Sequence, residues 1–238
     1  MLTCFKVRGV GVAALAAVAL AAPLAGAAIT GRVEIAGARQ KNYTGVAIWL
    51  EPVNGPAPKP AAGTHRILQK GKRFSPHVSV VPVGTTVDWP NRDPIFHNAF
   101  SNFAGQPFDT GLYAPGSTYK VKFVREGVVR VFCNIHSTMS AVIVVVKTPW
   151  YAVTGRDGTF RIDGVPPGEY QMKIWHERAD EASLERLERR VTVSAEGAIL
   201  PRVTLIESRV ARPPHKNKYG RDYGPEPRDK AVYGGAGR

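Results

Sequence analysis

The feature that most constrains the fold is a succession of short apolar segments in a chain interrupted by Gly, Pro, Asn and Asp. These segments span residues 29–35, 46–50, 78–83, 85–89, 119–124, 128–133, 141–146, 159–162, 170–175, 191–193 and 203–206. Segments of this length and spacing are typical of strands in sandwiches and barrels. The one helix candidate, Asp180–Arg190, is short and charged and places Leu184 and Leu187 on one face, which predicts a surface helix. The sequence therefore predicts an all-β protein.

Two changes in composition frame a central block at residues 64–147. A proline-rich stretch at residues 52–63 indicates an extended linker or loop, and Lys147-Thr148-Pro149 closes the segment that ends at Val146. The chain from Arg209 to Arg238 carries eight Lys/Arg against three Asp/Glu and shows no apolar periodicity. We therefore expect residues 209–238 to be a flexible, disordered basic tail.

The first 28 residues have the pattern of a signal peptide. Lys6 and Arg8 form a basic start, and residues 10–20 are apolar but short for a membrane span. Small residues at positions 25–27 suit cleavage, so the mature chain is expected to begin near Ala28 or Ile29. An uncleaved anchor helix is the alternative. Cleavage predicts a periplasmic or secreted protein with no integral membrane segment.

Cleavage would also remove Cys4 and leave Cys133 as the single cysteine. Cysteines of exported proteins are usually paired, so an unpaired one indicates a metal ligand, an inert buried thiol or an intermolecular bridge. His136 lies three residues after Cys133, and Met139 lies three further on, directly after the apolar segment 128–133. Thiolate, imidazole and thioether together are soft ligands that suit copper; zinc and simple packing of the thiol are the alternatives.

A second histidine could complete such a site. His97 follows the apolar segment 85–89 through an Asp93-Pro94 turn. The remaining histidines are predicted to be structural or surface residues: His77 and His176 near strand ends, and His65 and His215 in polar or flexible segments.

The block from Arg66 to Val146 resembles the cupredoxins, the plastocyanin-like blue copper proteins. The resemblance rests on Phe74-Ser75-Pro76, residues 83–87, residues 91–93, His97-Asn98, Phe108-Asp109, Pro115-Gly116 and Cys133-x-x-His136-x-x-Met139. It implies a Greek-key β-sandwich at residues 64–147.

The resemblance also implies one mononuclear copper ion with His97, Cys133 and His136 as equatorial ligands and Met139 as a weak axial ligand. Asn98 would tie the two ligand loops together by hydrogen bonds. The step from His136 to Met139 is shorter than in plastocyanin-like proteins. It is similar to the binuclear copper loop of respiratory oxidases, but that site needs a second cysteine, which this loop lacks.

The segments on either side of the block resemble the carboxypeptidase regulatory-like family, a small transthyretin-like β-sandwich. Residues 29–59 would supply its first strands. Residues 148–208, with turns at Asp157-Gly158 and at residues 166–168, would supply the rest. We therefore expect the cupredoxin domain to be inserted into a split sandwich.

The formal charge of +13 falls to +11 once Lys6 and Arg8 are removed. Such a charge favours acidic partners, and no nucleic-acid-binding motif is recognisable. The sequence thus predicts a blue copper protein, not an enzyme, that carries single electrons between redox partners. Its partner is expected to be an acidic protein of the cytochrome or dehydrogenase type. The alternatives are a copper-binding or envelope interaction module, and an accessory subunit of a periplasmic dehydrogenase.

Overall fold

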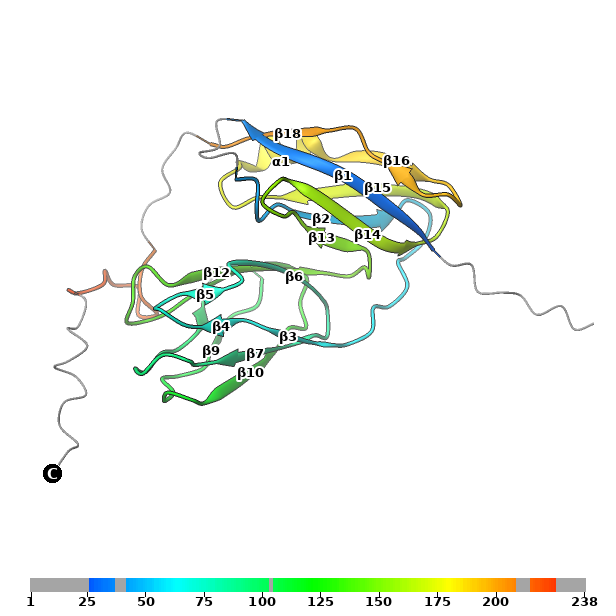
Figure 1. Cartoon of the computed structure of the whole chain (residues 1–238). Coiled ribbons are helices and arrows are strands. Elements are labelled where there is room, and N and C mark those ends of the chain that lie inside the picture. The colour runs from blue at the N-terminus through cyan, green and yellow to red at the C-terminus, as the bar shows by residue number, and fades with distance from the viewer. Residues whose placement is uncertain (1–25, 37–41, 103–104, 209–214, 226–238) are drawn as a thin grey trace, which may run out of the picture.

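The computed structural model describes residues 26–36, 42–102, 105–208 and 215–225, and these residues form an all-β protein with one short helix (Figure 1). Most of the expected signal peptide, residues 1–25, lies outside the described residues. Within the described ranges, no helix is long and apolar enough to cross a membrane. The strands gather into two units, which we call the central unit and the outer unit, and Figure 1 shows one stacked on the other.

The central unit is a sandwich of two sheets. The smaller sheet has the strand order β10-β7-β3, and the larger has the order β6-β12-β11-β8-β9, with a separate β4-β5 ladder. The strands are β3 (Thr64–Arg66), β4 (Leu68–Gln69), β5 (Phe74–Ser75), β6 (Val78–Pro82), β7 (Thr86–Pro90), β8 (Phe100–Ser101), β9 (Phe108–Asp109), β10 (Thr118–Lys122), β11 (Gly127–Phe132) and β12 (Ser140–Val146).

The core between these two sheets includes two of the predicted copper ligands. Trp89 from β7 and Phe123, just after β10, are fully buried and pack with Val129 and Val131 of β11. Each such side chain contributes about 1.5–3 kcal/mol when it leaves water. Cys133 and Met139 belong to the same apolar cluster. The loop at residues 133–139, called the ligand loop because it carries predicted copper ligands, is therefore attached directly to the buried core of the unit.

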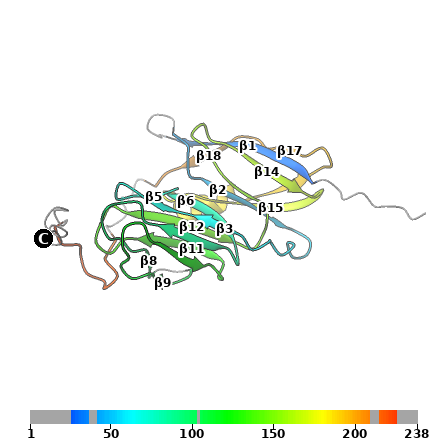
Figure 2. The same cartoon turned by 60° about the horizontal axis from the view of Figure 1, so that its bottom comes forward.

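The outer unit combines strands from both sides of the central block (Figure 2). β1 pairs with β14, β17 and β18, and β2 pairs with β13 and β15, with Ile29 opposite Ile162 and Ala47 opposite Trp175. The elements are β1 (Ala27–Ala36), β2 (Ala47–Pro52), β13 (Tyr151–Val153), β14 (Thr159–Val165), β15 (Gly168–Trp175), α1 (Glu181–Leu187), β16 (Arg189–Val193), β17 (Ala198–Ile199) and β18 (Val203–Ile206).

These pairings are what insertion of the central block into the outer unit would require, since β1 and β2 precede the block and their partners follow it. The insertion itself and the likeness of the outer unit to transthyretin-like sandwiches stay predictions. The helix α1 lies within the predicted surface helix, with Asp180 as its N-cap and Leu184 buried.

β12 connects the two cores. Its residues Ala141, Ile143 and Val145 pack in the central core, whereas Val144 and Val146 pack with Val80 and Ala47 in a separate cluster between the units. Both faces of this strand are covered, which explains its unbroken apolar sequence in place of alternation. Figure 1 shows β2 and β13 facing β6 and β12.

Residues 215–225 differ from the expected flexible tail. They lie against the central unit at the end where β11 leads into the ligand loop, and three of their residues, His215, Lys218 and Tyr223, make hydrogen bonds or ring contacts there. These contacts come from isolated polar and aromatic side chains, which leave no periodic pattern in a sequence. Residues 209–214 and 226–238 of that predicted tail lie outside the described residues.

Candidate metal centre

A hydrogen-bonded loop after β7 positions His97. The buried Asn91 side chain donates to the carbonyl of Ile95 and accepts from the N–H of Asp93, which closes the Asp93-Pro94 turn. Beyond the turn, His97 and Tyr113 exchange backbone hydrogen bonds of 3.3 and 2.9 Å. The histidine backbone is therefore fixed from both sides although it lies outside a regular strand.

A compact loop between β11 and β12 positions Cys133 and His136. The N–H of Cys133 donates to the carbonyl of Met139, and the N–H of Met139 donates to the carbonyl of His136, at 3.2 and 3.1 Å. The loop starts directly after Phe132, the last residue of β11, and ends at Ser140, where β12 begins. The short spacing between Cys133 and Met139 thus fits one tight turn held between two paired strands.

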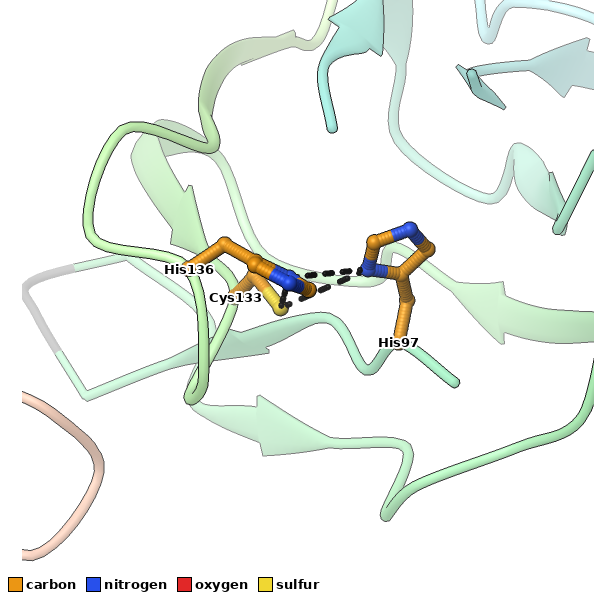
Figure 3. Close-up of side chains that lie close together, drawn as sticks. All are labelled: His97, Cys133 and His136. Carbon is orange, nitrogen blue, oxygen red and sulfur yellow. Dashed lines mark hydrogen bonds between the residues drawn. The ribbon is translucent and has the colours of Figure 1, made fainter. Parts of the chain in front are cut away.

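The three predicted equatorial residues meet at one point (Figure 3). The Nδ1 atoms of His97 and His136 are 3.1 Å apart, and the Cys133 Sγ lies 3.9 and 3.7 Å from them. All three residues are at least 98 % buried. Cys133 and His136 come from the loop between β11 and β12, and His97 comes from the loop after β7. The site therefore forms only when these two loops meet.

These distances suit a metal ion. The point equidistant from the corners of this triangle lies about 2.1 Å from each atom, close to ordinary metal–nitrogen and metal–thiolate distances of roughly 2.0–2.3 Å. A trigonal His₂Cys set with a distant thioether is typical of blue copper sites. The donor set therefore fits copper in both geometry and chemistry.

The Asp93 carboxylate fixes the orientation of His97. His97 Nε2 donates to Asp93 Oδ2 at 2.8 Å, and the same carboxylate accepts from the N–H groups of Gly71 and Lys72 at 2.6 and 2.9 Å. A carboxylate can only accept, so the proton lies on Nε2 and the lone pair of Nδ1 points to the other ligands. Burial raises the pKa of Asp93, but the three hydrogen bonds outweigh it and hold that pKa below its usual value.

Asn98 links the two ligand loops, as predicted. Its Oδ1 accepts from the N–H of Asn134 at 2.7 Å, and its Nδ2 donates to Asp109 at 3.3 Å. The Cys133 thiol itself is enclosed. Burial raises its pKa, while surrounding backbone N–H groups, including those of Asn134 and Ile135, act in the opposite direction. These N–H groups would stabilise a thiolate ligand in an otherwise apolar environment.

Met139 is fully buried in the same apolar cluster as Cys133, so it lies close to the site, and its role as axial ligand stays a prediction.

The other histidines lie elsewhere. His77 binds Glu177 and the carbonyl of Ser140, and His65 binds Ser79. The sequence predicted a turn at Asp93 and placed this residue in the motif at residues 91–93, but it did not predict the contact with His97; the spacing of four residues was the available sign of that contact.

The fold and this site together define the class: the central unit is similar to the cupredoxins. Three copper proteins of solved structure match part of the chain. A purple cupredoxin from Nitrosopumilus maritimus is 28 % identical, covers 34 % of this chain and 99 % of its own, and has a TM-score of 0.33. The P52G mutant of amicyanin, in its reduced Cu(I) form, is 22 % identical and covers 36 % and 85 %, with a TM-score of 0.34.

The third is a copper-containing nitrite reductase from Thermus scotoductus SA-01, with 29 % identity and a TM-score of 0.34. The match covers 41 % of this chain but spans only a quarter of the length of the nitrite reductase. No protein-family model and no curated protein sequence matches the chain.

Proposed function

We propose that this protein is an exported blue copper protein that carries single electrons between redox partners. One copper ion would be held by His97, Cys133 and His136, with Met139 as the axial ligand. The observation that carries the proposal is the buried triangle of two imidazole nitrogens and one sulfur, whose sides measure 3.1, 3.7 and 3.9 Å.

The chemistry that a bound copper ion supplies is a one-electron couple between Cu(I) and Cu(II). The protein residues hold the donor atoms in one place for both states, because the two ligand loops are joined by Asn98 and anchored by β11 and β12. Little has to move when the charge of the site changes, and this favours fast electron transfer. With Met139 as a fourth ligand, no position would be open for a substrate, so transport fits better than catalysis.

The export and partner assignments are part of the same proposal. An unpaired cysteine in an exported protein is explained if it is a metal ligand. The excess of basic residues, 32 Lys/Arg against 19 Asp/Glu, would attract a partner with an acidic surface and speed their association.

The test is to add Cu(II) to the purified protein and record its visible spectrum. We expect an intense blue colour that ascorbate bleaches and air or ferricyanide restores. Cys133→Ser should abolish the colour, whereas His65→Gln, a histidine outside the site, should leave it unchanged. A colourless copper complex, or one that does not cycle, would replace electron transport with a copper-binding role.

A further inference from the structure

Residues 215–225, which we call the C-terminal strap, lie along the ligand loop. The His215 ring stacks on Phe132 with a centroid distance of 3.8 Å, and its Nε2 lies 2.8 Å from the carbonyl of Ser137. The Lys218 N–H donates to Asn134 at 3.0 Å, and Tyr223 Oη donates to the carbonyl of Cys133 at 2.7 Å. The strap thus contacts Phe132 at the end of β11 and three residues of the ligand loop.

The strap also contacts the neighbouring part of the central unit. Asn102 donates to the carbonyl of Lys218, and Lys218 Nζ forms an ion pair with Asp109 at 2.7 Å. Asp109 in turn accepts from Asn98, the residue that joins the two ligand loops. The strap is therefore bound directly to the loop that carries Cys133 and His136, and it reaches Asn98, next to His97, only through Asp109.

The ligands themselves offer almost no surface to a partner. His97 and Cys133 are fully buried, and only 2 % of His136 is exposed. The strap lies on the ligand loop, so a protein that approaches this part of the loop contacts the strap. One connection between the strap and the site runs from Tyr223 through a single hydrogen bond to the backbone of Cys133.

The outer face of the strap is basic and aromatic. Tyr219 is 69 % exposed, with Lys218 Nζ 5.3 Å from the centre of its ring, and Lys216 and Arg221 are exposed beside it. The strap holds three Lys/Arg against one acidic residue, Asp222. Tyrosine and arginine are enriched in protein interfaces, and clustered positive charge selects an acidic partner.

We propose that the outer face of the strap, and not a copper ligand, is the docking surface for a redox partner with an acidic surface. This inference rests on the proposed function. In the productive encounter, one electron passes between the partner and the copper centre across the strap, and no bond is made or broken.

The first experiment locates anion docking on the metal-free protein by NMR. Hexacyanochromate(III), a redox-inert paramagnetic trianion, should broaden the backbone amides of residues 215–225 more than those around Lys122. Lys122 lies at the opposite end of the central unit, because it pairs with Thr86 at the start of β7 whereas the site follows the end of β7. Arg221→Glu should remove this preference, and the matched charge reversal Lys122→Glu should keep it.

The second experiment measures how fast ferricyanide oxidises the Cu(I) protein by stopped flow. At about 10 mM ionic strength, where charges act over roughly 30 Å, Arg221→Glu should slow the reaction at least threefold, and Lys122→Glu by much less. The strap is not the docking surface if the two variants slow the oxidation equally. The same conclusion follows if the chromium probe broadens the amides of the strap and those around Lys122 to the same extent. Both variants leave the predicted ligands intact. If the copper-loaded protein is blue, the proposed function stands whatever the docking result. If it is colourless, the proposed function is refuted independently of the docking result.

Discussion

The side-chain oxygen of Asn98 accepts a 2.7 Å hydrogen bond from the backbone N–H of Asn134, one residue after Cys133. This bond joins the loop that carries His97 to the loop that carries Cys133 and His136. It fixes the relative position of ligands that are 36 residues apart in the sequence. The geometry of the site thus depends on the side-chain amide of Asn98 as well as on the predicted metal-binding side chains.

Asn98→Ala should therefore weaken copper binding by about 10- to 100-fold, the usual effect of removing a residue that orients metal ligands. The three donor atoms stay, so a blue colour should still form at excess copper. Titration with a competing chelator measures the affinity. Asn42→Ala serves as the control, because Asn42 caps a turn of the outer unit and should not change the copper affinity.

Asp93→Asn should raise the reduction potential of the bound copper. The substitution removes a negative charge beside His97 and thereby destabilises Cu(II) more than Cu(I). With an effective dielectric constant near 20, the change is on the order of 50–100 mV. Cyclic voltammetry measures it, with the exposed Asp163→Asn as the charge-matched control. An unchanged potential would show that the Asp93 charge does not act on the metal.

Met139→Leu separates ligation from packing. Leucine replaces methionine with little change in volume, so the free energy of unfolding should fall by less than about 1.5 kcal/mol. If the thioether is the axial ligand, the potential should rise while the blue colour stays. Met172→Leu, at a fully buried methionine of the outer unit, should leave the potential and the spectrum unchanged. Identical potentials for Met139→Leu and the unmodified protein would assign Met139 to the core alone.

The pair formed by His77 and Glu177 should make the stability depend on pH. The hydrogen bond to Glu177 raises the pKa of His77 above 6.5, and the same bond lowers the pKa of Glu177 below 4.5. The histidine contribution is therefore complete below about pH 6.5 and is lost as the pH rises through the folded-state pKa. The glutamate contribution is present above about pH 4.5 and is lost as the pH falls through its folded-state pKa.

His77→Gln should accordingly lower Tm more at about pH 5.5 than at about pH 9. Both side chains are partly exposed, so the difference should stay below about 1 kcal/mol. The half-buried His65 provides the contrast, because burial lowers its pKa and Glu177 does not contact it in any described hydrogen bond. His65→Gln should not reproduce the larger loss at the lower pH.

The sequence predicted the all-β fold and three of the residues that meet at the site. Cys133 and His136 are recognisable because they share one short loop, and His97 because its loop follows a strand and carries Asn98. The rest depends on contacts that leave no periodic pattern. The carboxylate of Asp93 reaches the imidazole of His97 only after Asn91 closes the turn. His215 and Tyr223 bind the ligand loop across 78 and 90 residues of sequence through single polar atoms.

The pairing of β1 with β14, with Ile29 opposite Ile162, has a consequence for the order of folding. When the chain is synthesised from its N-terminus, the described partners of β1 are not available until the whole central block has been made. The central block has all of its own strands by then and can fold first. Once the central block is folded, its two ends are held together. Pairing of β1 with β14 then closes a loop that is effectively far shorter than the number of residues between the two strands implies. A copper centre assembled early would then speed completion of the unit that surrounds it in the sequence.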